Sequence, residues 1–146
     1  MNLTRIMSTG LLGGIMALGM AQAARADDKS EGGPLKVVVH LNVSESGVQG
    51  AGLKNITNLL KEAPDTKVEV VCHGAGIGLL EKARTDHTEA IASLIKKGVT
   101  FVACENTMRQ KSIRKEDLLP GVGTVPSGAV EVVRKQQKDG YAYFKP

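Results

Sequence analysis

The sequence predicts an α/β fold in which helices cover both faces of a parallel β-sheet. Short runs of β-branched residues alternate with longer segments that carry apolar residues at helical spacing, in the order βαβαβαβαβ. The strand-like runs are continuously apolar instead of alternating, which indicates burial on both faces, as in parallel sheets. Crossovers between such strands are right-handed, and ligands bind beyond the carboxyl ends of the strands.

Five segments are predicted to be strands, because each is a short run rich in β-branched or aromatic residues. They are residues 36–41, 67–72, 99–103, 123–125 and 141–144. The segment 73–78, which follows the second of these strands, contains three glycines and is predicted to be a loop.

Four longer segments are predicted to be helices, and one further helical turn follows the third of them. The helices are 50–62, 86–97, 106–111 and 127–138, and the extra turn is 116–119. The first helix has leucine and isoleucine at helical spacing and ends at Pro64. In the second helix, Asp86 and Glu89 have the spacing of a capping box, and Gly98 follows at a typical helix end.

The last predicted helix carries both a cap and an apolar pair. Ser127 has a side chain suited to capping its first turn. Val130 and Val133 are three residues apart and are expected to face inward.

The first 26 residues have the pattern of a secretory signal peptide. Arg5 supplies a positive start, residues 11–20 form a short apolar stretch, and small-x-small sites follow at 21–23 and 24–26. The alternative is an uncleaved membrane anchor, which the short apolar stretch argues against. We therefore expect a periplasmic protein with no membrane contact after cleavage, organised as a signal peptide at 1–26, a flexible lead-in at 27–34 and one domain at 35–146.

Charge and composition argue against nucleic acid as a partner. The chain has 19 basic and 15 acidic residues, and removal of Arg5 and Arg25 with the signal peptide leaves 17 basic residues and a net charge of +2. There is no Trp, and two Tyr and two Phe provide no platform on which bases could stack. Two cysteines are also too few for a disulfide-rich scaffold.

Polar features follow the ends of four predicted strands. They are the loop after His40 and residues 72–74, 104–107 and 126–127. Because the carboxyl ends of parallel strands meet at one edge of a sheet, these features are expected to converge there.

Cys104 is the candidate nucleophile at this edge. It follows the third predicted strand and precedes a predicted helix, so the free amides of Asn106 and Thr107 would favour its thiolate. Arg109, one turn further on, would add a positive charge, whereas Glu105 would raise the thiol pKa unless its carboxylate points away. The alternative is a buried structural cysteine, since free cysteines are common in protein cores.

Cys72 and His73 allow several interpretations. Cys72 either fills the core or forms a redox-active disulfide with Cys104, because neighbouring parallel strands lie about 5 Å apart. His73 could act as a general base or ligand, or hydrogen-bond a loop, while His40, on a buried strand, is expected to have its hydrogen bonds satisfied internally. A metal site formed by Cys72, His73 and Cys104 does not have the spacing of a structural zinc motif. We expect no cofactor.

A single reactive cysteine limits the chemistry that this chain can perform. Without a paired catalytic His and Asn signature it does not indicate a thiol protease, and without a CxxC pair it does not indicate a thioredoxin-type oxidoreductase. A lone nucleophilic sulfur can accept a sulfane sulfur as a persulfide and pass it on.

Several stretches together resemble the DsrE/DsrF-like family, and the resemblance covers essentially the whole mature chain. They are residues 36–40, 53–60, 70–74, 98–107, 117–122, 125–128 and 140–143. The resemblance implies a three-layer α/β/α fold with a five-stranded parallel sheet, and homo-oligomers that are trimers or hexamers. Family members relay persulfide sulfur, and the sulfur-accepting cysteine of the family aligns with Cys104.

Two features depart from the family pattern. Cys72 is not part of it, and a signal peptide would separate this chain from cytoplasmic relay partners. Our preferred hypothesis is a periplasmic sulfur carrier, similar to a sulfurtransferase, with Cys104 as the persulfide-bearing residue and a sulfur donor or acceptor protein or a small sulfur compound as its partner. The alternatives are a non-enzymatic small-ligand or metal-binding module, or a redox switch through Cys72 and Cys104.

Overall fold

A computed structural model describes residues 33–146 and contains a five-stranded parallel sheet with the strand order β4-β3-β2-β1-β5. The predicted signal peptide and most of the predicted lead-in lie outside the described residues. The strands are β1 (Lys36–Leu41), β2 (Lys67–Cys72), β3 (Thr100–Cys104), β4 (Gly123–Val125) and β5 (Ala142–Phe144). The α-helices are α1 (Ser46–Glu62), α2 (Thr88–Lys96), α3 (Glu105–Gln110) and α4 (Gly128–Gln137), and the 3₁₀ helices are η1 (Gly74–Leu80) and η2 (Lys115–Asp117).

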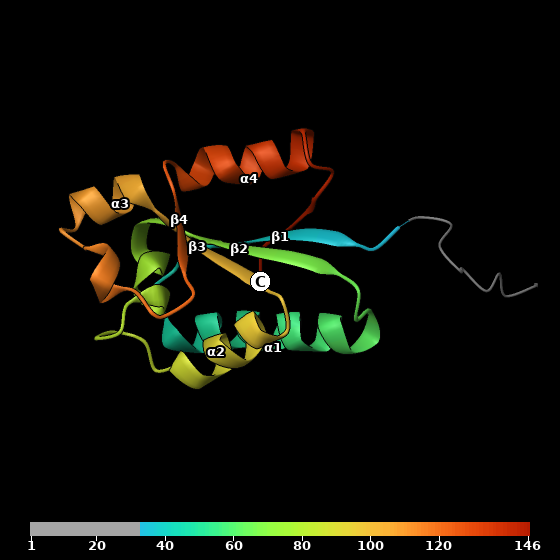
Figure 1. Ribbon diagram of the computed structural model, residues 1–146. Helices are drawn as coiled ribbons and strands as arrows, with labels where there is room; N and C mark the ends of the chain where they lie inside the picture. The colour runs from blue at the N-terminus through green and yellow to red at the C-terminus, as the bar shows by residue number, and fades with distance from the viewer. Residues whose placement is uncertain (1–32) are drawn as a thin grey trace, which may run out of the picture. The chain divides into compact units, whose positions relative to one another are not determined.

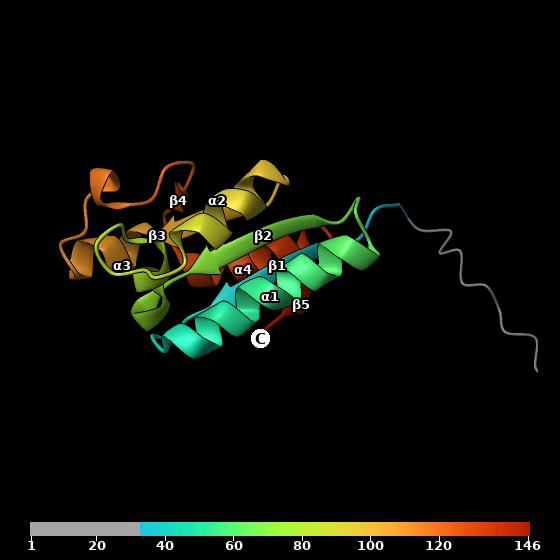
Figure 2. The same cartoon turned by 90° about the horizontal axis from the view of Figure 1, so that it is seen from below.

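Helices cover both faces of the sheet, as the sequence predicts. Figure 1 shows α3 and α4 above the sheet and α1 and α2 below it, and Figure 2 shows the face that α1 and α2 cover. The predicted α/β/α fold with a five-stranded parallel sheet is therefore confirmed. Within the part of the chain from residue 33 onward, no helix is long and apolar enough to cross a bilayer.

The strands contribute to two cores, because successive side chains point to opposite faces of a sheet. Val39, Val70 and Phe101 belong to the larger core, together with α1 and α2 residues such as Ile56 and Ile91, and each of these side chains is at most 1% exposed. A smaller core lies on the other face and consists of Val38, Val71, Val102 and Val132. Burial on both faces explains the continuous apolar runs in the sequence.

The segment that follows β2 is ordered helix and not the predicted loop. Residues Gly74–Leu80 form the 3₁₀ helix η1, in which Ile77, Leu79 and Leu80 are fully buried. Gly76 packs directly on the end of β1, where a side chain would collide with the Leu41 carbonyl group. The glycines therefore allow a close approach to the sheet, while the apolar residues between them join the larger core.

Two of the predicted helix caps are absent. Helix α2 begins at Thr88, and the Asp86 side chain accepts a hydrogen bond from the Ser46 hydroxyl at 3.4 Å instead of capping the helix. Ser127 precedes α4 but makes no side-chain cap hydrogen bond. Gly98 follows α2 with a φ of +89°, which is the left-handed geometry expected of a helix-ending glycine.

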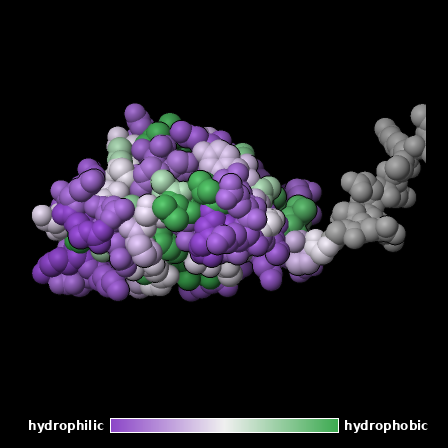
Figure 3. Space-filling view, turned by 90° about the horizontal axis from the view of Figure 1, so that it is seen from above, coloured by the Kyte–Doolittle hydropathy of each residue, from purple (hydrophilic) through white to green (hydrophobic). Residues whose placement is uncertain are grey.

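The prediction that Val130 and Val133 face the core is wrong. They are 63% and 49% exposed, whereas Val132 is 6% exposed and packs on the sheet. Figure 3 views the molecule from above, where apolar side chains (green) are exposed among polar ones. The inward face of α4 instead carries Gly128, Glu131 and Val132, which are all buried.

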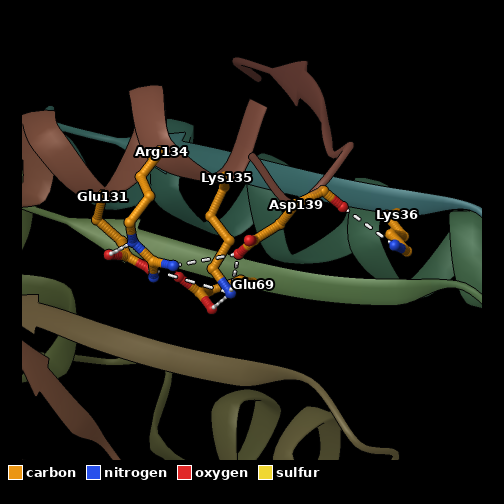
Figure 4. Close-up of polar contacts among 6 residues, drawn as sticks. All are labelled: Lys36, Glu69, Glu131, Arg134, Lys135 and Asp139. Atoms are coloured by element: carbon orange, nitrogen blue, oxygen red, sulfur yellow. Dashed lines mark hydrogen bonds and ion pairs between the residues drawn. The ribbon is translucent and has the colours of Figure 1, made fainter. Parts of the chain in front are cut away.

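Charged side chains anchor α4 to the centre of the sheet (Figure 4). Lys135 Nζ lies 2.8 Å from Glu69 Oε2 on β2 and 3.9 Å from Glu131 Oε1. The Arg134 guanidinium pairs with Glu131 and, at 3.3 Å, with Asp139. Glu69 and Glu131 are each 7% exposed, so the two carboxylates depend on these cations for compensation.

Burial raises the pKa of Glu69, although the hydrogen bond from Lys135 acts to lower it and contact with Glu131 raises it further. One oxygen of this carboxylate, Oε1, is buried without a hydrogen-bond partner. The positive charge of Lys135 thus offsets the free-energy cost of burying the Glu69 carboxylate beneath α4.

Replacing Lys135 by Met is therefore expected to lower the free energy of unfolding at neutral pH by about 3–5 kcal/mol, because two buried carboxylates lose a cation. The deficit should shrink at acidic pH, where the carboxylates are neutral. Urea unfolding at both pH values measures this, with Lys138→Met on the exposed end of the helix as the control. Equal stability of Lys135→Met and Lys138→Met at neutral pH would contradict the assignment.

Candidate functional site

Four chemically active side chains lie on the α4 face of the sheet, near the carboxyl ends of neighbouring strands. His40, His73 and Cys104 each come two residues after a valine of the smaller core, so they point to the same face as those valines. Tyr143 of β5 is the register partner of Val38 and shares that face. We call Tyr143, His40, His73 and Cys104 the polar row.

Hydrogen-bond donors surround the Cys104 sulfur. Burial raises the pKa of its thiol, but hydrogen bonds from the Gly128 N–H, from the N–H and hydroxyl of Thr107 and from the Asn106 N–H together lower the pKa below its usual value. The Thr107 hydroxyl oxygen accepts the Gly74 N–H at 3.0 Å, which leaves its own hydrogen for the sulfur. Cys104 is 4% exposed, so its side chain is almost fully buried although polar groups lie around it.

The neighbouring charges are directed elsewhere. The Glu105 carboxylate accepts a hydrogen bond from the Thr124 hydroxyl at 2.7 Å, so it is engaged with β4. The Arg109 guanidinium donates to the side-chain oxygen of Asn106. Arg109 thus contacts the Asn106 side chain, and the Asn106 N–H donates to the Pro126 carbonyl oxygen at 3.3 Å.

Cys72 points away from this site. It pairs in register with Ala103, so Cys104 is one residue further along β3 and faces the opposite side of the sheet. Both cysteines are free, and Cys72 is fully buried in the larger core, where burial raises the pKa of its thiol. A disulfide between Cys72 and Cys104 does not fit this arrangement, so the two cysteines do not form the redox pair that the sequence suggested as an alternative.

The same geometry bears on the metal-binding alternative. Because Cys72 lies on the far face, it cannot join His73 and Cys104 around one ion. No group of three or more His, Cys, Asp or Glu side chains within residues 33–146 is arranged to hold a metal.

The two histidines of the polar row contact each other. His40 Nε2 lies 2.6 Å from His73 Nε2, and His40 Nδ1 lies 2.9 Å from the Tyr143 hydroxyl. Burial lowers the pKa of His40, and His73 and the Lys145 ammonium lower it further. Burial and Lys145 likewise lower the pKa of His73. These shifts favour the neutral form of both imidazoles.

Gly128 separates His73 from Cys104. A β-carbon at position 128 would lie 3.0 Å from His73 Cβ and 3.2 Å from Cys104 Cβ. Both side chains therefore flank the first residue of α4, and the missing side chain lets its N–H reach the sulfur.

Sequence reasoning missed Tyr143 and treated His40 as a residue satisfied internally, without assigning it to the site. The period of two along each strand was the available signal, because it places His40 on the face of Val38. Tyr143 could be placed beside His40 only once the pairing register of β5 with β1 was known, and the sequence alone does not reveal that register.

Gly128→Ala is expected to raise the pKa of the Cys104 thiol, since the added methyl group pushes α4 and its N–H away from the sulfur. Overpacking should also cost about 1–3 kcal/mol of stability. The pH dependence of iodoacetamide alkylation, followed by mass spectrometry of the Cys104 peptide, measures the pKa. Gly47→Ala, where nothing lies within 4 Å of the new atom, is the control. An unchanged alkylation profile in Gly128→Ala would refute the role of this amide.

His40 and His73 are expected to contribute a loss of stability as the pH drops below 6.5, the ordinary histidine value. Both histidines have a lowered pKa in the folded protein, so the unfolded chain binds more protons in this range and is favoured. Each histidine contributes a slope of up to about 1.4 kcal/mol per pH unit. Urea unfolding should show a flatter acid limb for His40→Gln than for the wild type.

Comparison with known proteins agrees with this architecture. The model of the DsrE/DsrF-like family matches residues 9–146. A solved protein of unknown function from Methanobacterium thermoautotrophicum is 31% identical, with a TM-score of 0.73, over 77% of this chain and 99% of that one. The ychN protein from E. coli has the same coverage, 13% identity and a TM-score of 0.65, and at this identity it bears on the fold alone. Comparison with curated proteins finds no match.

Proposed function

Because this chain belongs to the DsrE/DsrF-like family, we propose that it is a sulfur-relay protein that carries sulfane sulfur as a persulfide on Cys104. The observation that carries the proposal is the place of Cys104 at the end of β3 against Gly128 of α4, where Gly128 and Thr107 act to lower the pKa of its thiol. Thiolates are the nucleophilic form of cysteine, and a site that lowers the thiol pKa raises their population.

The chemistry follows from this environment. The Cys104 thiolate attacks the outer sulfur of a donor, a new S–S bond forms, and the donor's own S–S bond breaks with its electron pair on the leaving group. The persulfide anion carries its charge near the same donors, which therefore stabilise the loaded form as well. An acceptor thiolate then attacks the outer sulfur and regenerates the Cys104 thiolate.

The limited exposure of Cys104 restricts its reaction partners. With 4% of the residue exposed, Cys104 lies beside His73 and Gly128 of α4 and offers little surface to a reagent. Small sulfur compounds fit this limited surface, and a protein partner would have to present its sulfur on a protruding segment.

The proposal includes an exported location and self-association. The pattern of residues 1–26 supports secretion to the periplasm. Resemblance to the family supports a homo-oligomer, either a trimer or a hexamer, and a sulfur donor or acceptor as the partner.

Incubation of the reduced protein with polysulfide or thiosulfate tests the proposal. We expect mass spectrometry to find the mass of one added sulfur atom on the Cys104 peptide, removable by a reducing thiol. Cys104→Ser should abolish the addition, and Cys72→Ser should leave it unchanged because Cys72 is fully buried. An unmodified Cys104 peptide after both treatments would contradict the proposal.

A further inference from the structure

The last residues of the chain continue along β1 beyond the end of β5. Phe144, which ends β5, is the register partner of Val39. Pro146 lies close to Leu41, two residues further along β1, since a β-carbon on Gly52 of α1 would be 3.0 Å from Pro146 Cγ and 3.3 Å from Leu41 Cδ2. The backbone therefore remains beside β1 after the last paired residue of β5.

This course places Lys145 beside His40, on the α4 face of the sheet. Because Pro146 contacts α1, the residue before it points to the opposite face. Tyr143, two residues before Lys145, already belongs to the polar row on that face. The position agrees with the electrostatics, since the Lys145 ammonium acts on both His40 and His73 and lowers the pKa of each.

No carboxylate among residues 33–146 pairs with this ammonium. None of the ion pairs in that part of the chain includes Lys145, and the residue is exposed. Two acidic side chains of α3 and α4 are engaged elsewhere, because Glu105 accepts a hydrogen bond from Thr124 and Glu131 pairs with Arg134. This edge of the sheet therefore carries an exposed positive charge that an anionic ligand can bind.

Three strand spacings separate Lys145 from Cys104. The strands follow the order β3-β2-β1-β5, and neighbouring strands lie about 4.8 Å apart, so the two backbones are about 14 Å apart. The lysine side chain shortens this gap, because its ammonium acts on both imidazoles that lie between the two residues. An anionic group on Lys145 must still be several bonds away from a sulfur atom at Cys104. Thiosulfate, with its oxygens on the adjoining sulfur, is too short to contact both.

We infer that the sulfur donor of Cys104 is the persulfide of a small acidic thiol of peptide size, whose carboxylate binds Lys145 while its outer sulfur meets Cys104. The inference rests on the proposed function. His40 and His73 are partly exposed and lie between the two ends of the donor. Their neutral rings offer an uncharged surface to the bonds that connect the carboxylate to the sulfur.

The transfer conserves atoms and electrons. The Cys104 thiolate attacks the outer sulfur of a donor R–S–SH, a new S–S bond forms, and the S–S bond of the donor breaks with its electron pair on R–S⁻. The hydrogen stays on the transferred sulfur, so the products are the Cys104 persulfide and the thiolate of the acidic thiol. An exposed cation acts mainly on the encounter with the donor, so its effect on the rate depends on salt.

Thiol–disulfide exchange tests the inference with three reagents. Cys104 in a Cys72→Ser background is reacted with glutathione disulfide, whose carboxylates are remote from the sulfurs, with dithiodipropionate, whose carboxylates are close to them, and with neutral hydroxyethyl disulfide. At about 0.15 M salt, Lys145→Gln should slow the reaction with glutathione disulfide by about three- to fivefold, as expected of one exposed ion pair. The other two rates should change by less than about 1.5-fold. Lys145→Glu should slow glutathione disulfide by about 10-fold.

The controls separate charge from folding and from thiol acidity. Lys138→Gln removes an exposed cation at the end of α4 and should match the parent with every reagent. Uncharged iodoacetamide should alkylate Cys104 at the same rate in the parent and in both Lys145 variants. The effect of Lys145→Gln on glutathione disulfide should disappear at about 1 M salt, where charges are screened beyond about 3 Å.

Equal rates of the parent and Lys145→Gln with glutathione disulfide, or equal slowing with all three disulfides, would overturn the inference. Equal slowing with the two anionic disulfides alone would also overturn it, because the distance between charge and sulfur would then have no effect. The exchange uses no sulfane sulfur. A protein that takes up sulfane sulfur without this charge dependence would keep the proposed function and lose the acidic donor, whereas the reverse result would keep the Lys145 site and lose the proposed function.

Discussion

The close approach of Gly128, the first residue of α4, to His73 and Cys104 joins helix α4 to the carboxyl ends of β2 and β3, and the candidate site depends on this contact. Its geometry requires that α4 lies close to the sheet, which the absent side chain at position 128 permits. Further along the helix, Lys135 holds α4 on β2 through the buried Glu69 carboxylate. The same packed helix therefore carries Lys135, which pairs with Glu69, and Gly128, which lies beside the Cys104 thiol and influences its pKa.

The fold was predictable because its strands are buried on both faces. Largely apolar, β-branched runs such as 36–41 and 67–72 have few other structural solutions, and the alternation with helices then leads to a parallel sheet. Local detail was less accessible. Residues 74–80 look like a loop by glycine content, but their apolar residues are core. The orientation of α4 follows from a buried ion pair that pattern reading treats as surface charge, which is why Val130 and Val133 were placed on the wrong face.

The candidate site was only partly predictable, for reasons of register. Cys104 stands out in the sequence because it ends an apolar strand, and the donors Asn106 and Thr107 follow it directly. The contact between His40 and Tyr143 joins residues 103 positions apart and needs the pairing of β1 with β5. The suggestion of a disulfide between Cys72 and Cys104 was wrong because the short distance between neighbouring strands does not determine on which face of the sheet each side chain lies.

The placement of the two cysteines on opposite faces also has a consequence for oxidative damage. These are the only thiols in the chain, and Cys72 is sealed within the larger core. An oxidised Cys104 therefore has no resolving thiol within its own subunit to trap a sulfenic acid before it advances to irreversible forms. Repair of Cys104 must come from a thiol on another molecule, and in an oxidising compartment the supply of that reductant would set how long the protein stays functional.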